Sequence, residues 1–379
     1  DVLGSLGSEM CIRDSCYADH FSSSYCFFKD NKTYNGKAGE EQVRKRTRNH
    51  NLSIKGIFKL GNRHKLSVGT EYIVDVLKSQ TDNIAKEDAY TLALFAQDEI
   101  KLLRNLQALI GVRYIYHENF KNHATPNVAL MYKPGKFNFR ASYAAGFRTP
   151  TLSELYATDI AKKNDRLTIG NLDLKSEKNN YFSLSAEYVH ERFSVSVNAF
   201  YNNIRDMIDY NTIATGDKAM EQYGHKEVRQ RDNIAEAKVH GINVSANAYL
   251  GAGFNLSGGY THLNTQDVEL EQPIDKSIKN AYNINAQWAH SWKIYRLNIN
   301  LNGRINSKRF SKSYGYAPEY QLWNLNTRHS FNLKSVIIEP GCGMENLFDY
   351  MDDRPYNSNY ATLTPGRSFY ISLSLKFKS

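Results

Sequence analysis

The side chains that most often do chemistry in proteins are few in this chain and do not form a recognisable catalytic or metal-binding pattern. Its 379 residues include 4 cysteines and 11 histidines. The cysteines, Cys11, Cys16, Cys26 and Cys342, lack both the spacing of a zinc site and an even disulfide framework. The chain contains no glycine-rich phosphate loop, no His-Glu-x-x-His motif and no serine nucleophile elbow. We therefore expect a protein that is not an enzyme and that holds no cofactor or metal of its own.

Arginine and tyrosine are the more informative side chains, because arginine attracts anions and a tyrosine ring can stack on a flat aromatic ligand. The chain has 26 tyrosines and a net charge of +9. That charge allows an anionic partner such as nucleic acid or lipopolysaccharide. The basic residues are scattered, however, and we interpret the cluster formed by Arg44, Lys45, Arg46 and Arg48 as a solvated loop. No nucleic-acid surface is predicted.

These side chains are carried by segments that alternate strictly between apolar and polar residues. In residues 295–305, Tyr295, Leu297 and Ile299 alternate with Arg296 and Asn298. The same pattern recurs in residues 182–188, 193–201, 242–250, 254–260 and 369–377. A period of two places one set on each face of a β-strand, and no helix can gather either set on one side. The sequence therefore predicts an all-β protein built from repeated hairpins.

Short and long connections alternate along these predicted strands. Short turns are expected at residues 61–64, 104–105, 134–136, 190–192, 251–253, 292–294 and 333–335. Longer polar connections lie between them, at residues 77–87, 118–124, 148–174, 207–228, 267–279, 306–317 and 351–364. Strict alternation puts every short turn at one end of the strands, which is the layout of a bacterial outer-membrane barrel with short periplasmic turns and long extracellular loops.

The fold class predicted from these patterns is an antiparallel transmembrane β-barrel of about 15 to 16 strands. No segment approaches the roughly 18 consecutive apolar residues of a membrane-spanning helix, so a helical membrane protein is excluded. A soluble β-sandwich or a propeller also alternates, but sandwich loops need not sort by length, and no blade repeat is present. Such a barrel could be a complete porin or a part of a wider barrel.

Several motifs favour the wider barrel. The chain contains Phe95-Ala-Gln-Asp-Glu99 with Gly111-Val-Arg-Tyr114, the segment 125–134, residues 144–156 with 170–177, and Asn233 to Gly241. It ends with Met344-Glu-Asn-Leu-Phe-Asp-Tyr350, Pro365-Gly-Arg-Ser-Phe369 and a last alternating strand. In this order, the motifs resemble those of TonB-dependent outer-membrane receptors over roughly residues 50–379. Gly170 and Ser176 stand where that family usually has prolines.

The resemblance implies a barrel of about 22 strands filled by an N-terminal plug domain. The plug binds TonB, which transmits the energy for importing a scarce nutrient, most commonly a ferric siderophore and otherwise cobalamin, haem or an oligosaccharide. Residues 148–171 contain no histidine, which makes haem less favoured. The implied partners are TonB, outer-membrane lipid, lipopolysaccharide and the nutrient. A passive diffusion porin remains the alternative from another functional class.

The residues expected to contact a ligand lie in the predicted extracellular loops. Arg148, Glu154 and Tyr156 match family positions in the 148–174 loop. Arg148 could attract an anion and Tyr156 could stack on an aromatic chelate, whereas an ion pair of Arg148 with Glu154 that shapes the loop base is the structural alternative. The tyrosines expected to form an aromatic platform are Tyr210, Tyr223, Tyr314 and Tyr316, although interfacial anchoring also predicts tyrosines at these positions.

The first 15 residues lack the alternation of the rest of the chain and do not have the pattern of a signal peptide. They resemble translated sequencing-adapter read-through. We therefore predict two regions: residues 1–15 as a junction artefact, and residues 16–379 as a partial receptor barrel whose natural N-terminal part is missing.

Overall fold

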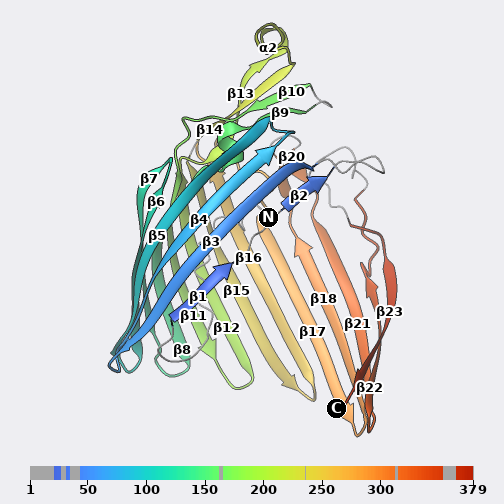
Figure 1. The fold of residues 1–379 in the computed structure, drawn as a ribbon. Helices are drawn as coiled ribbons and strands as arrows, with labels where there is room; N and C mark the ends of the chain where they lie inside the picture. The colour runs from blue at the N-terminus through green and yellow to red at the C-terminus, as the bar shows by residue number, and fades with distance from the viewer. Residues whose placement is uncertain are drawn as a thin grey trace. The chain divides into compact units, whose positions relative to one another are not determined.

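The computed structural model describes residues 21–26, 31–34, 43–161, 165–234, 236–311, 315–352 and 364–378. These residues form a sheet of 17 strands, a separate sheet of four strands, a two-stranded hairpin and two short helices (Figure 1). The described part contains no helix that is long and apolar enough to cross a membrane. The predicted all-β architecture is confirmed, while the suspected artefact at residues 1–15 lies outside the described residues.

The large sheet contains 17 strands, many of which pair antiparallel with the next strand along the chain. They are β1 (Phe21–Cys26), β2 (Asn31–Tyr34), β3 (Val43–Leu60), β4 (His64–Ser79), β5 (Ile84–Leu103), β6 (Leu106–His117), β7 (Lys121–Tyr132), β8 (Phe137–Arg148), β11 (Glu177–Val189), β12 (Phe193–Arg205), β15 (Ala237–Gly251), β16 (Phe254–Asp267), β17 (Asn280–Trp292), β18 (Tyr295–Asn306), β21 (Tyr320–Asn332), β22 (Val336–Glu345) and β23 (Ser368–Phe377).

The strand count agrees with the sequence prediction. Strands β1 and β2 are short, and both pair with β3, at residues 51–56 and at residues 43–47 respectively. They therefore occupy successive stretches of one strand position beside β3. The other 15 strands of the 17 are those predicted by alternation, so the described part of the chain fills about 16 strand positions.

Two compact units can be distinguished within the chain. One comprises Asp1–Met131, Ser142–Phe182 and Asn202–Ala237, and the other comprises Tyr132–Ala141, Ser183–Tyr201 and Lys238–Ser379. We call them the first unit and the second unit.

In the first unit, β3 to β6 have one apolar face and one polar face, as the alternation predicts. Leu52, Leu92 and Leu94 are exposed on the apolar face. On the opposite face the Asn51 amide donates to Glu71 at 2.8 Å, and Glu71 also pairs with Arg113. In this arrangement aliphatic side chains face outward, while carboxylates and amides pair on the other face of the sheet. A soluble protein has the opposite arrangement, and a membrane barrel has this one.

The predicted short turns are confirmed, but two of the predicted long connections are much shorter than expected. Strand β4 continues to Ser79 and β5 begins at Ile84, so that only residues 80–83 separate them. Residues 118–120 alone separate β6 from β7. The polar composition of these segments indicated loops. The strands continue because Leu77, Ile84 and Ala89 form a buried cluster with Leu152 beyond the apolar band.

The basic cluster at Arg44, Arg46 and Arg48 was also predicted to be a loop, and this prediction is wrong. Strand β3 begins at Val43, and its pairing with β4 runs without interruption from Lys45 to Leu60. The hydrogen bonds to β4 outweigh the poor strand propensity of a charged run, because each backbone group in the pair finds a partner.

Two of the long connections in the first unit contain structure of their own. Residues 149–176 include α1 (Leu152–Tyr156), β9 (Thr158–Ala161) and β10 (Arg166–Ile169). The connection after β12 forms β13 (Ile208–Thr215), α2 (Gly216–Tyr223) and β14 (Glu227–Asn233). The four strands make one sheet in the order β13, β14, β10, β9, which we call the loop sheet. Figure 1 shows it beyond the upper ends of β4 and β5.

In the second unit, the C-terminal motif organises the connection between β22 and β23. Asn346 is buried, and its amide nitrogen donates to the carbonyls of Tyr350 at 2.7 Å and Pro365 at 3.0 Å. Its side-chain oxygen accepts from the Tyr350 amide at 2.9 Å. Asp349 accepts from the Arg367 amide at 2.6 Å. The Asn-Leu-Phe-Asp and Pro-Gly-Arg segments of the motif are thus joined by hydrogen bonds. Another connection in this unit contains β19 (Arg309–Ser311) and β20 (Gly315–Ala317).

We expect Asn346→Ala to destabilise the protein by about 3 kcal/mol, because it removes three side-chain hydrogen bonds worth about 1 kcal/mol each. Urea unfolding in detergent or lipid measures the change. Asn346 has a φ of 51°, so Asn346→Gly is the matched control that loses the bonds without backbone strain. If Asn346→Gly is as stable as the wild type, strain rather than hydrogen bonding explains the asparagine.

Candidate ligand-binding site

Arg148, the last residue of β8, is held by two carboxylates at the base of the first structured loop. Its guanidinium donates to both oxygens of Glu154, at 2.8 and 3.2 Å. It also donates to both oxygens of Glu177 from Nε at 2.8 Å and from Nη2 at 2.6 Å. Paired parallel bonds of this kind suit the planar fork of arginine. The predicted pairing of Arg148 with Glu154 is confirmed, and Glu177 is a partner that sequence reasoning did not single out.

Local sequence explains why Glu154 reaches Arg148. The Thr151 hydroxyl caps α1 by accepting from the Glu154 amide at 3.2 Å, while Glu154 accepts from the Thr151 amide at 2.8 Å. This reciprocal capping box fixes the start of the helix. Leu152 and Leu155 are buried and anchor the same turn. The capping box therefore holds the Glu154 carboxylate at the position where Arg148 pairs with it.

Glu177 connects the ion pair to the second structured loop. Its Oε1 atom accepts from the backbone amide of Ile208, the first residue of β13, at 2.8 Å. Nearby, Asn233 donates to the carbonyls of Lys175 at 3.0 Å and Asp206 at 2.7 Å. Arg148 and Asn233, from two different motifs of the sequence, thus fasten the bases of both loops together within the first unit.

The electrostatics of the loop base favour the ionised forms of Arg148 and Glu154. Hydrogen bonding to Glu177 and Glu154 raises the pKa of Arg148 above its ordinary value, against the effect of burial. Burial alone would raise the pKa of Glu154, but hydrogen bonds from Arg148 and Thr151 outweigh it, so that the pKa lies below its ordinary value of 4.5. One arginine and two glutamates carry a net charge of −1. The triad therefore offers no excess positive charge to an anion.

Tyr156 packs at the same loop base. Its ring lies against both buried apolar clusters of the first unit, which contain Leu152 and Leu155. Burial, with smaller effects of Glu87 and Glu118, raises the pKa of its hydroxyl. These contacts fix the end of α1 against the sheet.

Gly170 and Ser176, the two departures from the usual family pattern, both make close local contacts. A Cβ atom on Gly170 would come within 2.4 Å of the Leu155 carbonyl oxygen. The backbone amide of Gly170 donates to the Ala157 carbonyl at 2.6 Å. A proline here would lack that hydrogen-bond donor. Ser176 is buried with its hydroxyl 3.5 Å from Nε2 of His123, which stacks on Phe147 with centroids 4.3 Å apart.

One face of the loop sheet is rich in arginine. Arg229 and Arg231 lie two residues apart on β14, and the register places Tyr210 of β13 opposite Arg231. Arg166 of β10 is aligned with Glu227, on the same face. The Arg231 guanidinium carbon lies 3.6 Å from the Tyr210 ring centroid, and its Nη2 donates to the Tyr210 hydroxyl at 2.6 Å. Val228, on the other face, is fully buried. We call this surface the arginine face.

The predicted tyrosines are distributed over different elements. Tyr210 lies on the arginine face and is 41% exposed. Tyr223 is the last residue of α2 and is partly buried. Tyr316 belongs to β20 of the second unit, is exposed, and contacts Phe310 edge-on at 5.3 Å. Tyr314 lies outside the described residues. Their contact with a ligand stays a prediction.

The arginines of this face were missed by sequence reasoning. Arg229 and Arg231 directly follow the polar connection predicted at residues 207–228 and were assigned to no strand, so their side chains could not be placed on a face. The alternation Glu227, Arg229 and Arg231 around the buried Val228 was the available signal. Among the described residues, no group of three or more histidine, cysteine, aspartate or glutamate side chains could hold a metal ion.

Comparison with known proteins identifies the family. Residues 13–347 match the family model described as TonB dependent receptor-like, beta-barrel, so the chain belongs to this family. It is 23% identical to the ferric enterobactin receptor of Pseudomonas aeruginosa over 372 aligned residues, covering 84% of this chain and 49% of the relative. The chain thus spans about half the length of that relative.

Solved structures show the same fold. A crystal structure of a variant of the Pseudomonas aeruginosa ferric enterobactin receptor aligns with a TM-score of 0.74 at 18% identity, over 92% of this chain and 57% of that one. The siderophore receptor PirA from Acinetobacter baumannii aligns with a TM-score of 0.71 at 16% identity, over 90% and 56%. The fold is that of an antiparallel transmembrane β-barrel. The protein is located in the outer membrane of a Gram-negative bacterium.

The loop base should loosen in acid. A carboxylate with a lowered folded-state pKa stabilises the fold above its ordinary pKa and loses that contribution as the pH falls through the lowered value. For Glu154 this loss of stability begins as the pH falls below about 4.5. We expect hydrogen exchange of the Leu155 and Asn171 amides, corrected for intrinsic rates, to accelerate over this range.

The Glu154→Gln variant should show fast exchange at pH 7 and no acceleration in acid. Glu221→Gln, at an exposed position on α2, should exchange like the wild type. Unchanged protection of both amides in Glu154→Gln at pH 7 would contradict the assigned role of the ion pair.

Proposed function

We propose that residues 16–379 are the barrel portion of an outer-membrane receptor that imports a ferric siderophore with energy supplied through TonB. Membership of the receptor family and the siderophore receptors among its relatives support this proposal. The complete receptor would contact TonB through the plug domain that precedes the barrel in this family. Outer-membrane lipid and lipopolysaccharide would surround the barrel. We propose transport without catalysis.

The observation that carries the choice of cargo is the arginine face. Ferric siderophores of the catecholate type are anionic and present aromatic rings at their surface. Arginines attract such an anion, and a tyrosine already stacked on a guanidinium adds a flat apolar surface. Arg231 and Tyr210 make this combination with a separation of 3.6 Å, and Tyr210 is partly exposed. The ligand would meet positive charge and an aromatic ring together.

The triad of Arg148, Glu154 and Glu177 has a supporting role in this proposal. Because its charge is −1 and each oxygen of both carboxylates faces the guanidinium, it positions the loops rather than attracting the chelate. Tyr156 contributes to the same positioning through its apolar contacts. Tyr223 is proposed as a further ligand contact in the first unit, and Tyr314 and Tyr316 are proposed, separately, as ligand contacts in the second unit.

Binding of a ferric tricatecholate to the protein reconstituted in nanodiscs tests the proposal. We expect Arg229→Ala with Arg231→Ala to weaken binding by about 100-fold or more, since each of the two charge-assisted contacts is worth about 1.5 to 3 kcal/mol. Intrinsic fluorescence quenching gives the affinity. Arg192→Ala is the matched control, because Arg192 is an exposed arginine in the short turn between β11 and β12.

Two results would separate the site from the cargo. Wild-type affinity in the double arginine variant would overturn the arginine face as the binding site. Failure of the wild type to bind any ferric chelate, with binding of cobalamin or a neutral oligosaccharide instead, would overturn the cargo. Uptake of labelled iron by cells that produce the complete receptor should cease when TonB is deleted, and continued uptake would indicate passive diffusion.

A further inference from the structure

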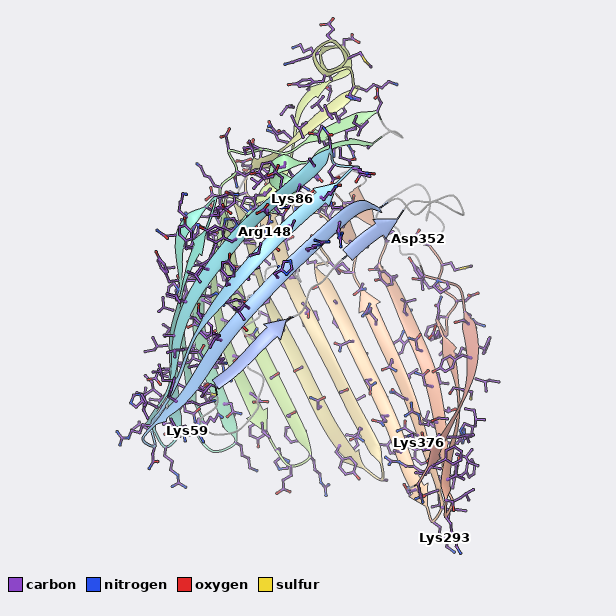
Figure 2. All side chains as sticks on the ribbon, viewed as in Figure 1. Lys59, Lys86, Arg148, Lys293, Asp352 and Lys376 are labelled. Atoms are coloured by element: carbon purple, nitrogen blue, oxygen red, sulfur yellow. The ribbon has the colours of Figure 1, made fainter. Side chains whose placement is uncertain are left out.

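Glu227 is a carboxylate among the cations of the arginine face, and we infer that it is a displaceable internal anion that determines which ligands bind there. It occupies Arg229, and it moves to Arg166 when an anionic ligand takes Arg229. The inference rests on the proposed function, because it concerns how the proposed binding surface selects its ligand. The residues involved belong to the loop sheet of the first unit. Figure 2 shows this sheet above Arg148 of the ion triad.

Glu227 pairs with Arg229 along one strand. The Arg229 Nε atom donates to Oε1 of Glu227 at 2.5 Å. The two residues are two positions apart on β14, so their side chains point to the same side of the sheet. The side chain of Arg229 is 34% exposed and that of Glu227 is 26% exposed. An ion pair this accessible contributes little free energy, and a ligand with several contacts can therefore replace it.

Arg166 offers Glu227 a second partner on the neighbouring strand. The parallel register of β10 and β14 aligns Arg166 with Glu227, which places both side chains on the arginine face. The Nε atom of Arg166 is buried and has no hydrogen-bond partner among the described residues. A buried donor without an acceptor is unfavourable. The aligned carboxylate of Glu227 supplies the missing acceptor when it turns from β14 toward β10.

The exchange of partners releases a guanidinium for the ligand. Moving the Glu227 carboxylate to Arg166 replaces one charge-assisted hydrogen bond with another, so its net free-energy change is small. The released Arg229 lies two residues from Arg231, whose guanidinium carbon is 3.6 Å from the Tyr210 ring centroid. An aromatic anion with several negative oxygens can then contact both arginines and the ring.

This exchange distinguishes between anions. A ligand with a single negative group only replaces Glu227 on Arg229 and gains little. Because Glu227 is tethered to the same strand, its effective concentration at Arg229 is on the order of millimolar or above, which small anions must exceed. A ligand with several negative groups also reaches Arg231 and the Tyr210 ring, which Glu227 does not contact. Specificity of this kind comes from an interaction that opposes the wrong partner.

A second carboxylate on the same face makes a useful comparison. Asp159 of β9 is aligned with Thr168 of β10, and Thr168 is aligned with Arg229 of β14. The Asp159 side chain makes no ion pair with another described residue. The charged residues of the face are Arg166, Arg229, Arg231, Glu227 and Asp159, with a net charge of +1. Glu227 and Asp159 thus carry the same charge on the same face, but only Glu227 occupies an arginine.

Titrations of the protein in nanodiscs, followed by calorimetry, test the inference. The probes are a ferric tricatecholate and 2,3-dihydroxybenzoate, an aromatic anion with one carboxylate. We expect Glu227→Gln to bind both probes about fivefold more tightly, because Arg229 no longer has an internal partner. Asp159→Asn is the matched control. It removes the same charge without releasing an arginine, so its affinities should rise by less than about twofold.

A double-mutant cycle tests the move to Arg166. Arg166→Gln should weaken tricatecholate binding about fivefold, because the displaced Glu227 then has no second partner. In the Glu227→Gln background the same change should have no more effect than Lys226→Gln, since no carboxylate has to be accommodated. Lys226 is an exposed residue directly before β14, and its removal measures the general effect of losing one positive charge. Arg166→Lys should bind like the wild type.

The outcomes separate this inference from the proposed function. Equal gains in Glu227→Gln and Asp159→Asn would overturn the inference, because simple repulsion would explain both. Equal effects of Arg166→Gln in the two backgrounds would overturn the move to Arg166. Tighter binding of dihydroxybenzoate by Glu227→Gln, without tricatecholate binding by any variant, would support the inference and overturn the cargo. Failure of every variant to bind either probe would overturn both.

Discussion

Backbone hydrogen bonding in a medium without water is the constraint on which this structure depends. Each peptide group within the hydrocarbon layer must find a partner in the protein, and paired strands supply one for every residue. Strand β3 pairs with β4 from Lys45 to Leu60 without a break. Because this register is continuous, the side chains of β3 and β4 alternate between a lipid-facing and an inward-facing set.

That division determines where polar chemistry can occur. Inside, Arg113 pairs with Glu71 and lies 5.8 Å from the Phe95 ring centroid. A Cβ atom on Gly69 would come within 2.4 Å of that ring, so the glycine leaves room for the aromatic side chain. The motif containing Phe95 and the motif containing Arg113 are thus two halves of one inward-facing contact, in adjacent strands.

The outer loops depend on a different interaction. The ion triad of Arg148, Glu154 and Glu177 joins the end of β8, helix α1 and the start of β11, and through the Ile208 amide it reaches β13. A buried ion pair is weak evidence for stability, because desolvation of the charges offsets their attraction. Here the triad sets the direction in which two loops leave the barrel wall, and the loop sheet with its arginine face follows from that direction.

Basic side chains lie on two separate surfaces of the first unit. Arg229 and Arg231 lie on the loop sheet, and Arg46 and Lys78 lie on the lipid-facing side of the strands. In both places a tyrosine is nearby, but for different reasons. Tyr210 stacks on a guanidinium, whereas Tyr72 and Tyr90 form part of an interfacial row. The two surfaces have similar residue types but different environments, and only the strand register distinguishes them.

The sequence by itself determined the strands, the short turns and the family. Alternation with a period of two is a local property, so Phe369, Ile371 and Leu373 identified an apolar strand face before any partner strand was known. The ion pair of Glu154 with Arg148 could be anticipated as one alternative because the two residues are only six positions apart in the chain.

Tertiary structure decided what depends on register over long separations. Glu177 is 29 residues from Arg148, and Tyr210 is 21 residues from Arg231. Local composition cannot reveal such pairs, because a one-residue shift in pairing would move each side chain to the other face. Composition also misled at residues 44–48, where a run of charged side chains suggested a loop. Its role as the start of a strand comes from the hydrogen bonds of β4, which the composition of β3 does not encode.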